Sequence, residues 1–351
     1  MQRFVSLTLL LLCLLSCRQQ PTEKETAGQL TIDTLLVVNT PRGQETDSDI
    51  AWILTAKTMI ESEHRAYGDD VYLSAAFFVH NLVAEQTTER YYYGSHKAIN
   101  LTGMAPTLLR LIGTYGALLQ SAYHAEHDYR FLPLCREMEL LADAHRTQRK
   151  GSGSLLKEME QVMERQMGPV PRSVFMLGCQ YTPLTFGQSM CSDNEYLSLT
   201  SFSHHPFGSP CVLEVAQNRY RDTFLNVPID TLVRITSTAL LQGHTVCWEG
   251  DLSNKHHTAH TKEVTQESRQ AAFDRFETTL NRALLLVGTA HDSHNRLFFI
   301  AQDLATGAQM YLSDSFFKMN TVAVTLSANC VPVSARQPVD QTDIFILPDS
   351  I

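Results

Sequence analysis

The chain has 351 residues, of which 44% are hydrophobic and 19% charged, and its formal net charge is −9. This composition is that of an ordinary globular protein, with enough length for one large domain or two. Because the chain has no stripe of lysine and arginine and no basic patch rich in aromatic residues, we expect no nucleic-acid partner.

Residues 1–16 have the pattern of a cleaved targeting signal. A basic residue, Arg3, precedes an apolar run from Val5 to Leu15, which is too short to span a bilayer comfortably. Residues 17–29 are mostly polar and have no periodicity, so we expect them to form a flexible tether.

The end of the apolar run, Leu14-Leu15-Ser16-Cys17, has the pattern of a lipobox. A lipobox cysteine is acylated and becomes the first residue of the mature protein, so Cys17 would hold the protein on a membrane. We therefore expect a lipoprotein of the bacterial cell envelope, on its periplasmic or surface face. The alternative is an ordinary signal peptide in which a cysteine stands by chance.

Six cysteines follow Cys17, and none belongs to a CxxC pair, which argues against a zinc or thioredoxin-like site. Disulfides are permitted outside the cytosol, but six cysteines allow fifteen pairings and the sequence does not choose among them. Cys211 and Cys247 lie in strand-like runs, where we expect buried, small apolar residues. The six are Cys135, Cys179, Cys191, Cys211, Cys247 and Cys330.

The front half of the chain has helical patterns. Residues 49–64 are apolar on almost every side, which is typical of a buried helix and not of an amphipathic one. Residues 105–120 and 154–167 also have helical spacing, and Gly151-Ser152-Gly153 marks a break before the latter.

The back half alternates strands with helices. Helical patterns at 229–241 and 264–279 interrupt short runs of β-branched or aromatic residues, which are bounded by turn residues. A helical half followed by a strand-rich half predicts an α+β fold. The predicted strands are Tyr196–Thr200, Val212–Val215, Thr245–Trp248, Leu284–Ala290, Leu297–Ala301, Gln309–Leu312 and Thr321–Leu326.

The segment Asp49-Ile50-Ala51-Trp52-Ile53-Leu54 resembles the Gly-x-Cys-Trp-x-Phe start of the central helix in bleomycin hydrolase and aminopeptidase C, the C1B branch of the papain-like cysteine peptidases. Further segments match this family in order and spacing, and the resemblance covers most of residues 35–328. They include Tyr196-Leu-Ser-Leu-Thr-Ser-Phe-Ser-His-His-Pro-Phe207, Asn226-Val-Pro-Ile-Asp230, Gly243-His-Thr-Val-Cys-Trp-Glu-Gly-Asp-Leu-Ser253 and Thr265-Gln-Glu-Ser-Arg-Gln-Ala-Ala-Phe273.

The resemblance implies a papain-like α+β fold over residues 30–335. Such a fold has a helical half with a central buried helix, a strand-rich, barrel-like half, and the active cleft between them. A helical insertion is expected at about 120–190, and residues 336–351 are expected to form a C-terminal tail.

The family's chemistry needs four groups. A cysteine thiolate attacks, a histidine activates it, an asparagine orients the histidine, and a glutamine six residues before the cysteine helps to hold the oxyanion. The resemblance places Ala51 at the cysteine, Arg282 at the histidine and Asp303 at the asparagine. Glu45 stands at the glutamine, although a slip of one residue would bring in Gln44.

These replacements predict the loss of cysteine-peptidase chemistry. An alanine methyl cannot attack a carbonyl, and an arginine stays protonated at physiological pH and cannot act as a general base. We therefore expect a pseudopeptidase whose cleft binds a peptide or a protein. The alternative is an active cysteine-type aminopeptidase with a rearranged site. No cofactor and no metal are expected, and whether the chain forms a homo-oligomer stays open.

Five other residues belong to the site that the resemblance implies. Trp52 matches the tryptophan that follows the nucleophile. Thr102-Gly103 stands at the Gly-Gly pair that binds the substrate backbone. His204 and His205 belong to the family's His-His-Pro-Phe run, and we interpret them as structural polar groups or as cleft lining.

Three hypotheses concern single features. Arg282 and Asp303 are expected to form an ion pair across the former active site, because the family's histidine and asparagine face each other there. We interpret Ser48 as the N-cap of the buried helix, not as a substitute nucleophile. The three tyrosines from Tyr91 to Tyr93 are expected in an edge strand or a loop.

Overall fold

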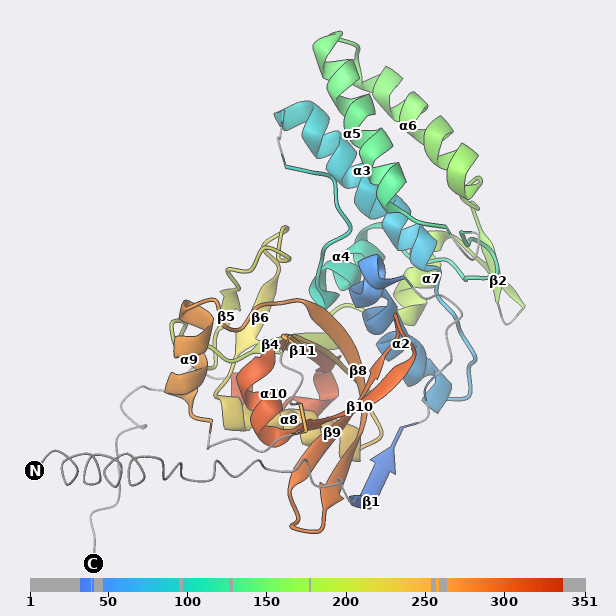
Figure 1. Ribbon diagram of the computed structural model, residues 1–351. Coiled ribbons are helices and arrows are strands. Elements are labelled where there is room, and N and C mark those ends of the chain that lie inside the picture. Colours follow the sequence, from blue (N-terminus) through green and yellow to red (C-terminus); the bar gives the residue numbers. More distant parts are fainter. Residues whose placement is uncertain are drawn as a thin grey trace, which may run out of the picture. The chain divides into compact units, whose positions relative to one another are not determined.

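The computed structural model describes residues 32–38, 40, 47–94, 97–125, 129–176, 178–253, 257–258 and 264–336 (Figure 1). The expected signal and tether, Cys17, Glu45 and residues 337–351 lie outside these ranges. Within them, no helix combines the length and the apolar character needed to cross a membrane.

The central helix is α2 (Ala51–Ala66), which follows a short 3-10 turn, η1 (Ser48–Ile50). The first twelve residues of α2 are all buried, so the buried helix predicted over 49–64 is confirmed. Two of these residues are charged. Lys57 and Glu61 form an ion pair at 3.1 Å, and Glu61 also accepts a hydrogen bond from the Leu73 N–H.

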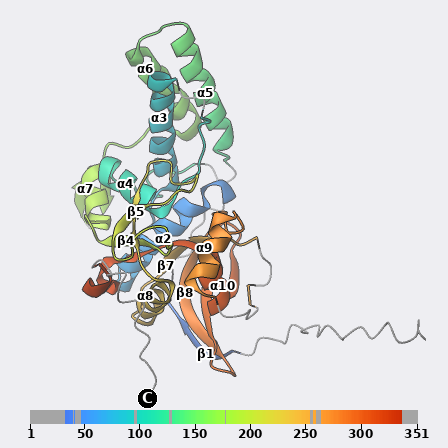
Figure 2. The ribbon, with the colours of Figure 1, turned by 90° about the vertical axis from the view of Figure 1, so that its left-hand side faces the viewer.

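The helical half also contains α3 (Ala75–Tyr93), α4 (Ala105–Tyr115), α5 (Leu132–Thr147), α6 (Ser152–Met167), α7 (Pro183–Met190) and a hairpin of β2 (Val174–Met176) and β3 (Cys179–Tyr181). In Figures 1 and 2, α3, α5 and α6 lie side by side, and α4 contacts α2, α3 and α7. Helices α3 and α4 contact α2, and two strands of the strand-rich half also contact it, which explains why α2 is apolar on almost every side.

Capping residues set the ends of α3 and α4. The Ser74 side chain accepts a hydrogen bond from the Phe77 N–H at the start of α3, and Gly94, at φ 60°, ends it. The tyrosines from Tyr91 to Tyr93 are therefore the last turn of a helix, and the expectation of a strand or loop is wrong. The helix predicted over 105–120 ends at Tyr115, because the next residue, Gly116, has a φ of 84°. Only glycine fits at this position, since a Cβ there would meet the Pro183 backbone.

The strand-rich half is built on a sheet that has nine strands within the described residues. Its order is β10-β9-β8-β7-β11-β4-β6-β5, and β1 also pairs with β8. The pairs are antiparallel except β4 with β6. The bounds are β1 (Ile32–Val37), β4 (Tyr196–Thr200), β5 (Pro210–Val212), β6 (Thr223–Asn226), β7 (Val246–Gly250), β8 (Arg282–Asp292), β9 (Leu297–Asp303), β10 (Ala308–Ser313) and β11 (Thr321–Ser327).

Strand β8 lies at the centre of the core. Every residue from Ala283 to Ala290 is buried, which is typical of a strand covered on both faces. Leu284 and Leu286 pack with residues of α8 (Ile229–Leu241), and α2 contacts both β7 and β8. Two further helices, α9 (Gln266–Asp274) and α10 (Asp314–Asn320), contact each other. The predicted α+β fold is therefore confirmed.

The six cysteines of the described residues are free thiols. Cys211 and Cys247 are buried in or beside the sheet, as predicted from their strand-like surroundings. Cys135 and Cys330 are buried as well, whereas Cys179 is exposed.

Candidate functional site

A small cleft, of about 150 Å³, lies where the N-terminus of α2 meets the strand-rich half. Five residues that the resemblance implied line it: Ala51, Trp52, Thr102, Gly103 and Arg282. The other lining residues are Ser48, Asp49, Gln217, Glu249, Leu280, Asn281 and Ala283. The fold thus brings together segments that are far apart in the chain, as the sequence predicted.

The backbone enters α2 through η1. Asp47 caps this turn, because its Oδ1 accepts a hydrogen bond from the Asp49 N–H at 3.0 Å. The interpretation of Ser48 as the N-cap is therefore wrong, and Ser48 instead lines the cleft. Ile50 holds the N-cap position of α2 and supplies no side-chain hydrogen bond. The positive end of the α2 dipole therefore lies at the cleft beside Ala51.

Trp52 fixes the loop that forms one wall of the cleft. Its Nε1–H donates to the Leu101 carbonyl at 2.6 Å, and its ring lies directly against Gly103. A Cβ at Gly103 would come within 2.5 Å of the ring, so only glycine allows this approach. The Thr102-Gly103 backbone is thereby held in place next to the start of α2.

Glu249, on β7, is a site residue that the sequence reasoning missed. Its Oε1 accepts a hydrogen bond from the Ala105 N–H, the first residue of α4, at 3.0 Å. Its Oε2 is buried and has no hydrogen-bond partner among the described residues, and the side chain is 1% exposed. The available signal was an acidic residue within an otherwise apolar strand.

The surroundings of Glu249 disfavour its ionised form. Burial raises the pKa of this carboxyl to about 8, and the negative charge of Asp222 acts in the same direction, while the hydrogen bond from Ala105 opposes both. At neutral pH the group is therefore mainly protonated. The Ala105 N–H occupies Oε1, so the proton belongs on Oε2, where the carboxyl can donate.

Arg282 begins β8, pairs in register with Gly250, and lines the cleft partly buried. Asp303 is buried at the end of β9, and its Oδ1 accepts hydrogen bonds from the N–H groups of Ala305 and Thr306, at 3.0 and 3.3 Å. No ion pair joins Arg282 to Asp303 among the described residues, so that prediction is wrong.

The register of the two strands explains this result. Leu285 lies opposite Gln302, and the antiparallel pairing therefore places Asp303 closer to Leu284 than to Arg282. Asp303 instead closes the turn from β9 to β10.

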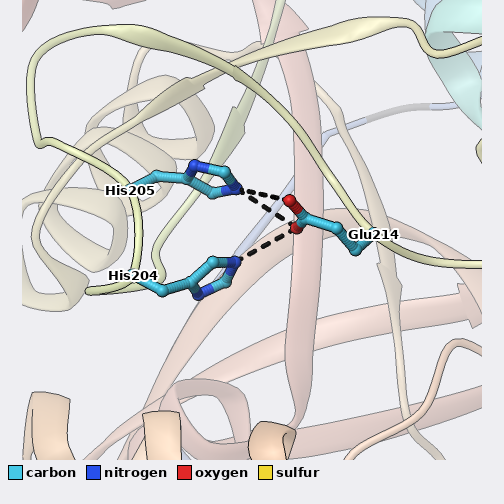
Figure 3. A group of neighbouring side chains, drawn as sticks. All are labelled: His204, His205 and Glu214. Atoms are coloured by element: carbon cyan, nitrogen blue, oxygen red, sulfur yellow. Dashed lines mark hydrogen bonds and ion pairs between the residues drawn. The ribbon is translucent and has the colours of Figure 1, made fainter.

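His204 and His205 lie outside the cleft lining and meet Glu214 (Figure 3). The Nε2 atom of each histidine lies 3.1 Å from the Glu214 carboxylate. Burial works against ionisation of Glu214, but the hydrogen bonds from both histidines outweigh it and lower its pKa. The interpretation as structural polar groups fits this arrangement.

The three ligand atoms of this histidine–glutamate group lie within 4.8 Å of one another, a spacing that a metal ion can occupy. A neighbouring amide instead favours a hydrogen-bonded role for His204. Gln270 Oε1 accepts from the Ser203 N–H at 2.7 Å, which directs its Nε2 toward His204 Nδ1 at 3.0 Å. Nδ1 must then accept, so Nε2 carries the proton and donates it to Glu214.

In the papain-like fold, the N-terminus of a buried helix meets a cleft against a mainly antiparallel sheet. This chain has that fold. It resembles the crystal structure of PepW from Lactobacillus rhamnosis, with a TM-score of 0.61 and 16% identity over 88% of this chain and 83% of that one.

Two further solved structures are less similar. Procathepsin L 3 of the Tenebrio molitor larval midgut has a TM-score of 0.37 and 13% identity, over 83% of this chain and 67% of that one. A structure from work on the mite allergens Blo t 1 and Der p 1 has a TM-score of 0.40 and 12% identity, over 88% and 74%. No family model matches the sequence, and no curated protein matches it.

Proposed function

We propose that this chain is a pseudopeptidase of the bleomycin hydrolase and aminopeptidase C type, which binds a peptide or a protein in its cleft without cleaving it. The position of Ala51 carries the proposal. This residue lies at the N-terminus of the buried central helix and lines the cleft, where the family it resembles has its nucleophilic cysteine. A methyl group has no lone pair with which to attack a carbonyl.

The neighbouring positions support the same conclusion. The described residues that line the cleft include neither a cysteine nor a histidine. Arg282 stands where a general base is needed and remains protonated. Asp303 is engaged in a turn, so it does not orient a catalytic group.

The features that would hold a peptide are still present. Trp52 and Gly103 fix the loop that stands at the substrate-binding position of the family, and Glu249 ties the start of α4 to β7. Thr102 is exposed at the edge of the cleft, and its N–H donates to Asn100 Oδ1 at 3.1 Å, which holds this backbone in place. A preformed wall of this kind lowers the entropic cost of binding an extended chain.

Assays on aminoacyl fluorogenic substrates test the proposal. The purified mature protein is expected to show no turnover above a no-protein control, with or without prior treatment by a thiol-alkylating reagent. Turnover that the alkylating reagent abolishes would refute the proposal and favour an active cysteine-type aminopeptidase with a rearranged site.

A further inference from the structure

Arg282 is a partly buried cation without a partner in the described part of the chain. Arg282 lines the cleft, and its side chain makes no hydrogen bond or ion pair to another described residue. A charge that is partly removed from water without a counter-ion is unfavourable. The flat guanidinium most readily pairs with the two oxygens of a carboxylate or with a similar oxyanion.

The N-terminus of α2 adds a second positive feature to the same cleft. Its N-cap residue, Ile50, has no side-chain hydrogen bond to the helix, and Ala51 at the first position has too small a side chain to cover the helix end. The Ala51 N–H itself donates to the Ser48 carbonyl, so this end acts on a ligand mainly through the helix dipole and the N–H groups that follow Ala51. The first N–H groups of a helix and the dipole behind them favour an anion.

Glu249 supplies an independent observation. This lining side chain is 1% exposed, and its Oε2 has no hydrogen-bond partner among the described residues, although buried polar atoms ordinarily have one. Because Glu249 is mainly protonated at neutral pH, it adds no negative charge there and can donate its proton to a ligand oxygen.

We propose that the cleft binds a carboxylate of its peptide ligand, with Arg282 as the counter-ion and the α2 N-terminus and the Glu249 hydroxyl as further donors. The carboxylate belongs to the peptide's C-terminus or to an aspartate or glutamate side chain. The inference rests on the proposed function, since it defines the ligand group that the same cleft selects.

Asp49 is the lining residue whose charge opposes such a ligand. It forms no ion pair with Arg282 within the described residues, so it does not neutralise the guanidinium. Its charge reduces the affinity for an anion without removing the site. The variant Asp49→Asn should therefore bind a carboxylate more tightly than the wild type.

Ligand-observed NMR with two small probes tests the inference on the full mature chain at pH 7. N-acetylglycine carries the carboxylate, and N-acetylglycinamide is its neutral counterpart. A fragment of this size is expected to bind with a Kd of about 1–10 mM. The amide should bind at least about tenfold more weakly, and Arg282→Gln should weaken binding of the acid by about tenfold or more.

Arg234→Gln is the matched control, because Arg234 is exposed on α8 and does not line the cleft. It should bind N-acetylglycine like the wild type. The thermal midpoint of Arg282→Gln, measured alongside, should be no lower than that of the wild type and so show that the variant is folded. Each of three results would overturn the inference. They are equal binding of the acid and the amide, undiminished binding of the acid by folded Arg282→Gln, and no binding of N-acetylglycine.

Two peptide mixtures separate this inference from the proposed function and identify the source of the carboxylate. One mixture has free C-termini, and the other has amidated C-termini with the same sequences. Preferential retention of the free acids supports a C-terminal carboxylate, and retention of only the aspartate- and glutamate-containing amides supports a side chain. Retention of both mixtures without regard to acidic groups would overturn the inference and leave the proposed function standing.

Discussion

At the scale of single residues, the proposed loss of activity rests on two replacements whose chemical effects agree. In this proposal Ala51 stands where the resembling family has its nucleophile, and Arg282 stands where that family has its proton acceptor. Neither change depends on the other for its effect, since each alone prevents the family's mechanism. Restoring the cysteine alone should therefore give a reactive thiol without peptidase activity.

We predict that Ala51→Cys creates a reactive but catalytically silent thiol. The α2 dipole and the nearby Arg282 should lower the thiol pKa, so iodoacetamide should alkylate it at pH 7 about tenfold faster than the exposed Cys179. Aminoacyl substrates should remain uncleaved, because the described residues of the cleft include no histidine to take the thiol proton and pass it to the leaving amine. Mass spectrometry of the modified protein and a fluorogenic assay measure the two properties.

The double variant Ala51→Cys with Arg282→Gln is the control for this prediction. It should lose most of the rate advantage, because the cation that favours the thiolate is gone. Peptidase activity in the single variant would show that Arg282 is no obstacle to catalysis.

Glu249 gives the protein a pH-dependent stability. Burial raises the pKa of its carboxyl from 4.5 to about 8, so the folded protein retains a proton that the unfolded chain releases between these pH values. The contribution of this group to stability is complete below about pH 4.5 and is lost as the pH rises to about 8. Asp222 is the charged group that acts on this carboxyl, and Asp49 and Arg282 are the other charged residues that line the same cleft.

The variant Glu249→Gln should abolish this loss, because glutamine stays neutral and its Oε1 can still accept from Ala105. We expect the variant to exceed the wild type in free energy of unfolding by up to about 4 kcal/mol at pH 8 and by little at pH 5. Urea unfolding at both pH values measures the difference. Parallel pH profiles for the two proteins would contradict the account.

At the scale of elements, hydrophobic patterns predicted several helices and the strands β4, β7, β8, β9, β10 and β11. They missed β1, β2, β3 and β6, and the strand predicted over Val212–Val215 overlaps β5 only at Val212.

The bounds expected for β4 and α8 match the structure. Helix α8 has an apolar buried side and is followed by Gly243, whereas β4 also buries the polar Ser198 and Thr200. The tyrosines that end α3 were misassigned, since three consecutive aromatic residues favour a strand locally. The Ser74 cap and Gly94 stop override that preference.

The candidate site was predicted as far as the resemblance extends. Ala51, Trp52 and the Thr102-Gly103 loop could be placed together because their segments match a known order of motifs. The Asp303 contacts depend on strand register and on turn geometry, neither of which is visible in residue types. Glu249 was missed for a related reason, because an acidic residue in a strand has no characteristic spacing.

The buried charges of α2 give a prediction for this element. Glu61 is 1% exposed and accepts hydrogen bonds from Lys57 Nζ and from the Leu73 N–H. Glu61→Ala should lower the free energy of unfolding by about 3–5 kcal/mol, because it removes one partner of a buried ion pair and a buried acceptor. Denaturant unfolding monitored by circular dichroism measures this loss.

The exposed pair of Arg275 and Glu277, 3.5 Å apart, supplies the control. Glu277→Ala should change stability by less than about 1 kcal/mol, since solvent screens the pair. Equal effects of the two substitutions would contradict the role given to Glu61.

At the scale of the whole molecule, the proposed lipid anchor determines where the cleft operates. If Cys17 is acylated, the wild type should fractionate with membranes, and Cys17→Ser should appear in the soluble fraction. Immunoblots of the separated fractions measure the distribution. A Cys17→Ser protein that stays with the membranes, or processing that globomycin does not affect, would contradict lipidation.

The central claim is that the papain-like cleft binds peptides and leaves them intact. The most direct measurement incubates the mature protein with a peptide mixture, recovers the protein, and identifies the retained peptides by mass spectrometry. We predict intact retained peptides, their loss in Thr102→Trp, which obstructs the cleft, and their retention in Thr114→Trp, an exposed control on α4. Shortened peptides, or no retained peptides at all, would contradict the claim.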